Sequence, residues 1–297
     1  MRSRPSDYEL VAPGKLSAVL ELLACEPGVW LPIAGGTELM VQYGAGRLGA
    51  GKLVSLWGLP ELRRIEQTAQ ELIIGSGCTY TDLRNHPQIA QEFPLLARAA
   101  SWTGSVANQN RGTLGGNIVN ASPAADSLPA LMVYEAELLL ASVRGQRRVP
   151  YVGFHTGYKQ TKLNADEIVA AIALRPRFAN YHSYSRKVGT RNAQAIAKLC
   201  LAALGKISAN KIDDVRLAIG SMAVTPLRLR RTEASLLGRE WSPALVRDAR
   251  QALESEVAPI DDIRSSAAYR IHVAGNLLQE FVESLFAREQ VSAEHAQ

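Results

Sequence analysis

Blocks of hydrophobic and polar residues near the N-terminus predict a compact β–α–β unit. Residues 16–24 have the spacing of a short amphipathic helix, residues 29–34 form an apolar run typical of a strand, and residues 37–43 return to helical spacing. A glycine-rich loop at 44–52 leads into a second apolar strand at 52–56. Strand, helix and strand within one short segment are typical of a single supersecondary unit.

The rest of the chain continues with mixed strand and helix patterns. Its predicted elements are strand 71–77, helices 79–90 and 94–103, a glycine-rich turn, a loop and a late strand across 111–142, a hairpin return at 144–148 and strand 167–174. The pattern changes near 176–181, and a clear strand at 214–224 then precedes helices at 232–238, 243–257 and 265–288. Strands followed by helices predict an α+β domain distinct from the part before it.

Composition and charge narrow the function classes. The chain has 297 residues, of which 47% are hydrophobic and 21% charged, which excludes a disordered protein and allows about two domains. No apolar run is long enough for a membrane span, and no apolar leader suggests export. The net charge is +5, but no basic run supports nucleic-acid binding. Cys25, Cys78 and Cys200 are far apart, which predicts no disulfide framework, no metal site and a cytoplasmic location.

The first of two glycine sites lies between a predicted strand and a predicted helix. The run Pro-Ile-Ala-Gly-Gly-Thr-Glu-Leu covers residues 32–39, with Gly35 and Gly36 at the turn. Such glycines allow positive φ and a close approach of a ligand to the backbone. The unpaired N–H groups at a helix start favour an anion such as a phosphate. The alternative is a simple tight turn in which Thr37 caps the helix.

The second glycine site covers residues 111–126 and contains three glycines, two asparagines and few large side chains. Such a segment builds little core, but it can offer backbone N–H groups, the Thr113 hydroxyl and the Asp126 carboxylate to a polar ligand. Asp126 could accept hydrogen bonds from sugar hydroxyls, or it could instead cap a helix before Ser127. Two phosphate-friendly glycine turns in one chain suggest a dinucleotide, whose identity composition leaves open.

Six segments together resemble the FAD-binding subunit of the xanthine dehydrogenase family of molybdenum hydroxylases. They are residues 34–39 (AGGTEL), 113–131 (TLGGNIVNASPAADSLPAL), 107–111 (ANQNR), 149–158 (VPYVGFHTGY), 166–169 (DEIV) and 183–187 (SYSRK) with Arg191. The resemblance covers roughly residues 5–288. The two glycine segments at this separation are the specific part of it.

The resemblance implies an α+β fold in which two subdomains bind FAD, similar to the PCMH/VAO type. A C-terminal α+β domain with a small antiparallel sheet and helices follows. The implied domains are 1–177, with subdomains of about 1–57 and 58–177, and 178–297. The resemblance also places a strand within 195–204, where the pattern alone fits a helix equally well.

The resemblance implies that FAD is bound noncovalently, with its pyrophosphate over residues 33–39. Asp126 is expected to reach the sugar or ribityl hydroxyls, and Lys187 to lie close to the flavin. A side chain at Gly35 or Gly116, at positive φ, is expected to abolish flavin binding and leave the chain folded. The implied cofactor-binding residues are Pro32, Ile33, Ala34, Gly35, Gly36, Thr37, Glu38, Leu39, Trp102, Thr103, Thr113, Gly115, Gly116, Asn117, Ser122, Asp126 and Lys187.

The family's activity implies an electron-transfer oxidoreductase subunit with no catalytic residue and no metal ligand in this chain. A large subunit with the molybdenum cofactor and a small subunit with two [2Fe–2S] clusters are the implied partners in a heterotrimer. The acceptor, such as NAD or a quinone, and the organic substrate stay open. One alternative is a self-sufficient FAD oxidase, for which His155 or Tyr158 would be the candidate base. Another is an assembly subunit without flavin, which the intact glycine pairs disfavour.

Overall fold

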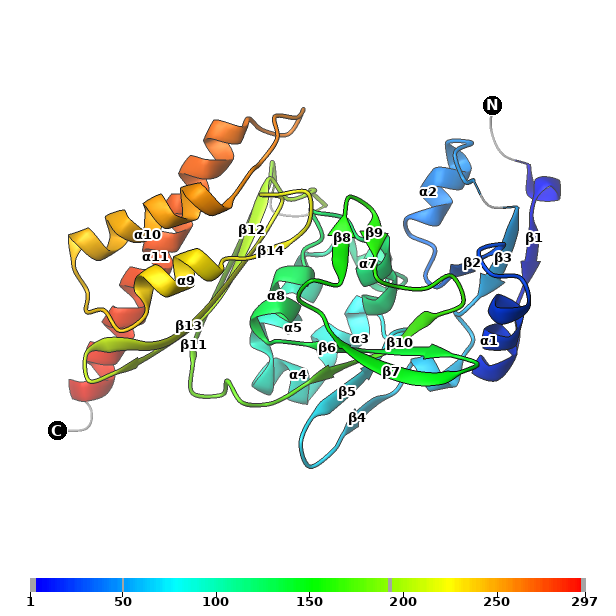
Figure 1. The fold of residues 1–297 in the computed structure, drawn as a ribbon, viewed down its shortest axis with the longest axis horizontal. Coiled ribbons are helices and arrows are strands. Elements are labelled where there is room, and N and C mark those ends of the chain that lie inside the picture. The colour runs from blue at the N-terminus through cyan, green and yellow to red at the C-terminus, as the bar shows by residue number, and fades with distance from the viewer. Residues whose placement is uncertain (1–3, 50, 192–193, 295–297) are drawn as a thin grey trace. The chain divides into compact units, whose positions relative to one another are not determined.

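The computed structural model describes residues 4–49, 51–191 and 194–294, and Figure 1 shows their course. Residues 1–3 of the expected first domain and residue 50 of the expected glycine loop lie outside the described residues. The packing divides the chain into two compact units, each made of separate segments. Unit 1 consists of Met1–His86, Thr103–Ala121 and Glu135–Pro176, and unit 2 of Pro87–Trp102, Ser122–Tyr134 and Arg177–Gln297. The division at 177/178 stays a prediction.

Unit 1 contains three sheets. Its elements are η1 (Pro5–Asp7), β1 (Glu9–Val11), α1 (Leu16–Cys25), β2 (Trp30–Ile33), α2 (Leu39–Gly44), β3 (Lys52–Ser55), η2 (Pro60–Leu62), β4 (Ile65–Gln67), β5 (Leu72–Gly75), α3 (Tyr80–Asn85), α6 (Val106–Gln109), α7 (Leu114–Asn120), β6 (Glu137–Ser142), β7 (Gly145–Pro150), β8 (His155–Gly157), β9 (Gln160–Thr161) and β10 (Ile168–Leu174). The strand orders are β1-β3-β2, β4-β5-β10-β6-β7 and β8-β9. Strands β2 and β3 are parallel and flank α2, so the predicted β–α–β unit is confirmed.

The core of unit 1 joins the three-stranded and five-stranded sheets. Helix α1 buries Val19 and Leu23 in the same cluster as Val54 of β3 and Ile168 of β10. Every residue of β10 is buried, as is typical of a central strand that is covered on both faces.

Unit 2 is one antiparallel sheet with helices on both faces. Its elements are α4 (Pro87–Glu92), α5 (Pro94–Trp102), α8 (Leu128–Val133), β11 (His182–Val188), β12 (Leu199–Ser208), β13 (Lys211–Gly220), β14 (Leu227–Arg228), α9 (Arg230–Leu236), α10 (Pro243–Glu256) and α11 (Ala267–Glu294). The strands follow the order β11-β12-β13-β14. One sheet face packs on α9, α10 and α11, while α8 contacts β12 and β13, and α5 contacts β11. The expected α+β class and C-terminal antiparallel sheet are confirmed.

Two predictions about local structure were wrong. The single helix expected over 79–90 is two helices, α3 and α4, which are separated at His86. His86 is extended because a residue before proline is disfavoured in the helical region. Residues 111–142 were expected to hold a turn, a loop and one strand, yet they also contain α7 and α8. Glycine and asparagine are poor helix formers, so their abundance hid α7.

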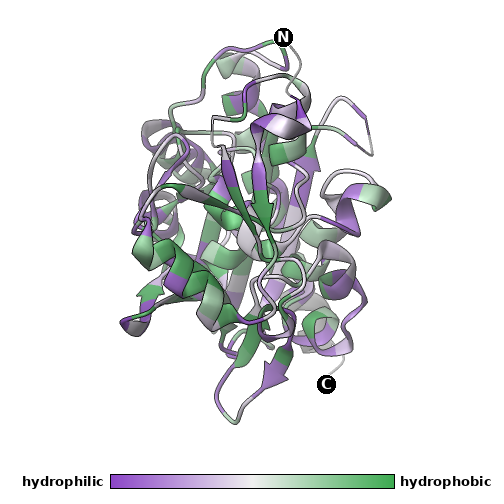
Figure 2. Cartoon of the chain, turned by 90° about the vertical axis from the view of Figure 1, so that its right-hand side faces the viewer, coloured by the Kyte–Doolittle hydropathy of each residue, from purple (hydrophilic) through white to green (hydrophobic). Residues whose placement is uncertain are grey.

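The strand that the resemblance placed within 195–204 is present as β12, which begins at Leu199. None of the helices in the described part of the chain is both long and apolar enough to cross a membrane. In Figure 2, both hydrophilic and hydrophobic residues occur on the helices.

Candidate functional site

The first glycine segment is an open loop between β2 and α2. Gly36 has a φ of +75°, in the left-handed region where glycine has no steric penalty. Its carbonyl accepts a hydrogen bond from Met40 N–H at 2.9 Å and so starts the helical turn. Within the described residues, the N–H groups of Gly36, Thr37 and Glu38 donate to no protein group. Thr37 does not cap α2, because Glu38 holds the N-cap position without a side-chain bond.

Gly35 is required for a different reason, which is the close approach of the second glycine segment. A Cβ atom at Gly35 would lie 1.6 Å from the carbonyl oxygen of Arg111 and 3.1 Å from Gly112 N. The structure therefore brings both glycine segments together, backbone against backbone. The expectation of positive φ at Gly35 and Gly116 was wrong, since among the two glycine pairs only Gly36 adopts it.

The second glycine segment forms the start of α7, and its backbone is internally bonded. The Thr113 hydroxyl caps the helix by accepting from Gly116 N–H at 3.1 Å. Leu114 N–H donates to the Cys78 carbonyl at 3.0 Å, and Gly115 N–H to the Ser76 carbonyl at 2.9 Å. The expectation that this segment offers backbone N–H groups to a ligand is wrong for these three residues.

Helix α7 exposes the backbone of one glycine and the polar side chains of two asparagines. Gly116 is exposed, and Asn117 and Asn120 are half-buried. Gly115 is buried against Ser76, where a Cβ atom would lie 2.4 Å from Ser76 Cβ. Of this glycine pair, one residue therefore allows close packing and the other leaves open backbone on the surface.

In unit 2 the candidate residues form a buried ion pair. Lys187 lies on β11, and its Nζ atom donates to Asp126 Oδ2 at 2.6 Å and to the Trp102 carbonyl at 2.9 Å. The two charged side chains are only 11% and 7% exposed. The pair thus links the loop before α8, the last residue of α5 and the edge strand of the sheet.

Asp126 has one oxygen atom without a partner. Burial raises the pKa of the Asp126 carboxyl to about 6, although the Lys187 ammonium favours the charged form. Its Oδ1 atom is buried and meets no donor among the described residues. An unmet buried acceptor is costly, so this atom marks a position where a ligand hydroxyl would be stabilising. Burial also raises the pKa of the Cys200 thiol, on the strand position paired with Lys187.

The loop that carries Asp126 is fixed to the end of β13. The Ser122 hydroxyl accepts a hydrogen bond from Ala124 N–H at 3.3 Å, and the Pro123 carbonyl accepts one from Ser221 N–H at 2.8 Å. A Cβ atom at Gly220 would lie 3.3 Å from that Pro123 carbonyl. Asp126 does not cap α8, because Ser127 holds the N-cap position.

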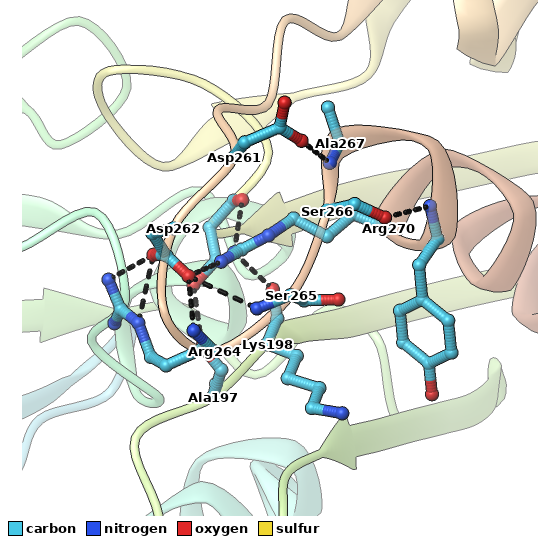
Figure 3. A network of polar contacts seen from close by, with 11 residues as sticks. Ala197, Lys198, Asp261, Asp262, Arg264, Ser265, Ser266, Ala267 and Arg270 are labelled. Atoms are coloured by element: carbon cyan, nitrogen blue, oxygen red, sulfur yellow. Dashed lines mark hydrogen bonds and ion pairs between the residues drawn. The ribbon is translucent and has the colours of Figure 1, made fainter.

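A second polar network holds the same end of the sheet (Figure 3). The Arg270 guanidinium is 2% exposed and donates to the carbonyls of Lys198 and Ser221 at 2.6 and 3.2 Å, and to Asp262 Oδ1 at 2.7 Å. Asp262 also accepts from Arg264, and the pKa of its carboxyl is held at about 2 by these hydrogen bonds and charges. Ser221 therefore connects this network to the Asp126 loop.

The predicted site residues fall into two sets. Unit 1 holds Pro32, Ile33, Ala34, Gly35, Gly36, Thr37, Glu38, Leu39, Thr103, Thr113, Gly115, Gly116 and Asn117, and unit 2 holds Trp102, Ser122, Asp126 and Lys187. The sequence reasoning missed Lys159, whose ammonium contacts Glu38 and Asn120. Its position directly after the segment 149–158, already part of the resemblance, was the available signal. No cluster of metal-ligating side chains occurs among the described residues.

Comparison with known proteins assigns both parts of the chain to one kind of subunit. Residues 6–176 match the FAD binding domain in molybdopterin dehydrogenase, and residues 184–285 match the CO dehydrogenase flavoprotein C-terminal domain. The xanthine dehydrogenase FAD-binding subunit of Escherichia coli O157:H7 is 30% identical over 92% of this chain and 94% of its own length.

A carbon monoxide dehydrogenase is similar to this chain in both sequence and structure. Its medium chain from Hydrogenophaga pseudoflava is 28% identical over 96% of this chain and 99% of that one. A solved structure of that enzyme, lacking the Mo-pyranopterin moiety of the molybdenum cofactor, matches 96% of this chain with a TM-score of 0.91 and 27% identity. The resemblance seen in the sequence is thereby confirmed, and the chain belongs to the family of FAD-binding medium subunits of the molybdenum hydroxylases, oxidoreductases of the xanthine dehydrogenase and CO dehydrogenase type.

Proposed function

We propose that this chain is the FAD-binding electron-transfer subunit of a molybdenum-containing hydroxylase. It receives electrons from the [2Fe–2S] clusters of a small partner subunit and passes them to an external acceptor. A large partner subunit with the molybdenum cofactor oxidises the organic substrate. The observation that carries the proposal is the buried Asp126–Lys187 pair, in which one carboxylate oxygen still lacks a donor.

The residues present fit FAD in both units. In unit 1, the N–H groups of Gly36, Thr37 and Glu38, which have no protein partner among the described residues, suit a diphosphate. In unit 2, a ribityl or ribose hydroxyl would supply the donor that Asp126 Oδ1 lacks. The neutral backbone donors of unit 1 suit an anionic group, and the open acceptor of unit 2 suits a hydroxyl group.

FAD, when bound, supplies the redox chemistry, and the protein supplies binding and electrostatics. Asp126 accepts from the hydroxyl and fixes the orientation of the Lys187 ammonium. The Lys187 ammonium lies in a buried environment, where a charge stabilises an opposite charge on a neighbouring group more strongly than it would in water. The remaining residues of both sets, Pro32 to Leu39, Trp102, Thr103, Thr113, Gly115, Asn117 and Ser122, shape these two positions.

The two candidate bases for the alternative of a self-sufficient oxidase are poorly suited to that role. His155 is 8% exposed, its Nε2 atom lies 2.8 Å from the Ile118 carbonyl, and burial lowers its pKa. Its ring is therefore buried and held against α7. Tyr158 is 64% exposed, so its side chain lies largely in solvent.

The proposal is tested with the purified full chain. Acid precipitation should release all of the flavin, because the binding is noncovalent, and dithionite should bleach the flavin bands. Xanthine, aldehydes or carbon monoxide should give no turnover with a dye acceptor until both partner subunits are added. A Gly116→Ala variant serves as the matched control that folds but carries little flavin. Turnover by the isolated wild-type chain would overturn the proposal in favour of the oxidase.

A further inference from the structure

A small hairpin of unit 1 brings a lysine to both glycine segments. Strands β8 and β9 form the hairpin, and Lys159 lies at its turn with a φ of +57°. The base of the hairpin is attached to α7, since the buried His155 ring bonds the Ile118 carbonyl. The hairpin tip is therefore held in a defined place beside α7.

The Lys159 ammonium bridges the ends of the two segments. Its Nζ atom donates to Asn120 Oδ1 on α7 at 2.6 Å and lies 3.3 Å from Glu38 Oε1 beside α2. The Lys159 and Glu38 side chains are 34% and 47% exposed, so both charges can be reached by a ligand. This contact places a positive charge at the side chain of Glu38, a residue whose own N–H group has no protein partner among the described residues.

A diphosphate bound at residues 32–39 would need a positive charge close by. The only ionisable side chain between residues 32 and 39 is Glu38, an acid, which would repel a diphosphate. We propose that Lys159 is the cation that recognises the diphosphate of the cofactor and thereby selects a dinucleotide over a flavin without it. The inference rests on the proposed FAD function and concerns affinity alone, because Lys159 moves no electron and no proton.

The backbone conformation of Lys159 allows charge and structure to be tested separately. Glycine adopts positive φ without the steric cost that a lysine meets there. Lys159→Gly should therefore leave the apoprotein at least as heat-stable as the wild type while it removes the ammonium. If Lys159 had a purely structural role, Lys159→Gly would instead lower the heat stability of the apoprotein.

The experiment measures the Kd of the full-length apoprotein for FAD by flavin fluorescence titration. Lys159→Gln and Lys159→Gly should each raise the Kd roughly tenfold, the size of one charge-assisted hydrogen bond. Lys159→Arg should stay within about twofold, and added salt should weaken binding less in Lys159→Gln than in the wild type. Lys162→Gln is the matched control, an exposed lysine just beyond the same hairpin, and should not change the Kd.

A second background separates direct recognition from mere neutralisation of Glu38. Lys159→Gln should weaken FAD binding equally in a Glu38→Gln protein, because the ammonium acts on the diphosphate itself. Loss of the effect in that background, an unchanged Kd in Lys159→Gln, or an equal loss in Lys159→Arg would overturn the inference. A wild-type chain that binds no FAD would instead remove the proposed function, and this inference with it.

Discussion

The segment after β2 and the segment that starts α7 both contain a Gly-Gly pair, yet their backbones are used differently. After β2, Gly36 adopts positive φ and the following N–H groups have no protein partner. At α7, the N–H groups of Gly115 and Gly116 bond to Ser76 and to the Thr113 hydroxyl. Among the described residues, the first segment therefore leaves backbone donors open, whereas the second uses its backbone donors within the fold.

Each pair also divides into a glycine that another part of the chain contacts closely and a glycine with more space around it. At Gly35 and Gly115 another part of the chain comes too close for a Cβ atom, whereas at Gly36 and Gly116 the nearest atoms belong to side chains, at 3.3 and 2.9 Å. The two glycines of each pair are therefore required for different physical reasons. Substitutions at the four glycines can separate them.

The largest effect is expected for Gly35→Ala. The new Cβ atom would lie 1.6 Å from the backbone carbonyl of Arg111, which no side-chain rotation can relieve. We expect the free energy of unfolding to fall by on the order of 4 kcal/mol, or the chain not to fold at all. Denaturant unfolding by circular dichroism measures the loss. Gly44→Ala, where nothing lies within 4 Å, is the control, and equal stability of the two variants would contradict the packing role.

A smaller contrast is expected within the second pair. Gly115→Ala brings a Cβ atom to 2.4 Å from Ser76 and should cost about 3 kcal/mol, as overpacking does. Gly116→Ala meets only the Thr113 hydroxyl at 2.9 Å, so its stability should change by less than about 1 kcal/mol while FAD affinity falls. Thermal unfolding and flavin titration of both variants give the comparison. Full FAD occupancy in Gly116→Ala would show that this face does not bind the cofactor.

The unit 2 site differs from both glycine segments because it depends on pH. The pKa of Asp126 is about 6 in the native state and near its ordinary value when unfolded, so the native state binds a proton more tightly. Between about pH 4 and pH 6, the apoprotein should therefore lose stability as the pH rises, by about 2 kcal/mol relative to Asp126→Asn. Unfolding midpoints of both proteins across this range test the sign. Parallel pH curves would contradict it.

Local pattern alone predicted much of the fold. The spacing of apolar residues predicts the β–α–β unit, the helices over 16–24 and 243–257 and the strand at 167–174. Such spacing is informative because a helix buries one face, whereas a central strand is buried along its whole length. The glycine segments were also visible as the places that build little core. What spacing could not predict was α7, because its stability comes from the Thr113 cap and from packing against Ser76.

The sequence by itself determined the family, the two glycine segments and, through the resemblance, the separate candidates Asp126 and Lys187, because each stands in a recognisable run of residue types. Only the tertiary structure decided which N–H groups stay open, which glycine faces a backbone, and that Lys159 reaches Glu38 from far along the chain. These features are contacts between distant segments. A local pattern carries no information about which carbonyl or carboxylate the fold brings to a given atom.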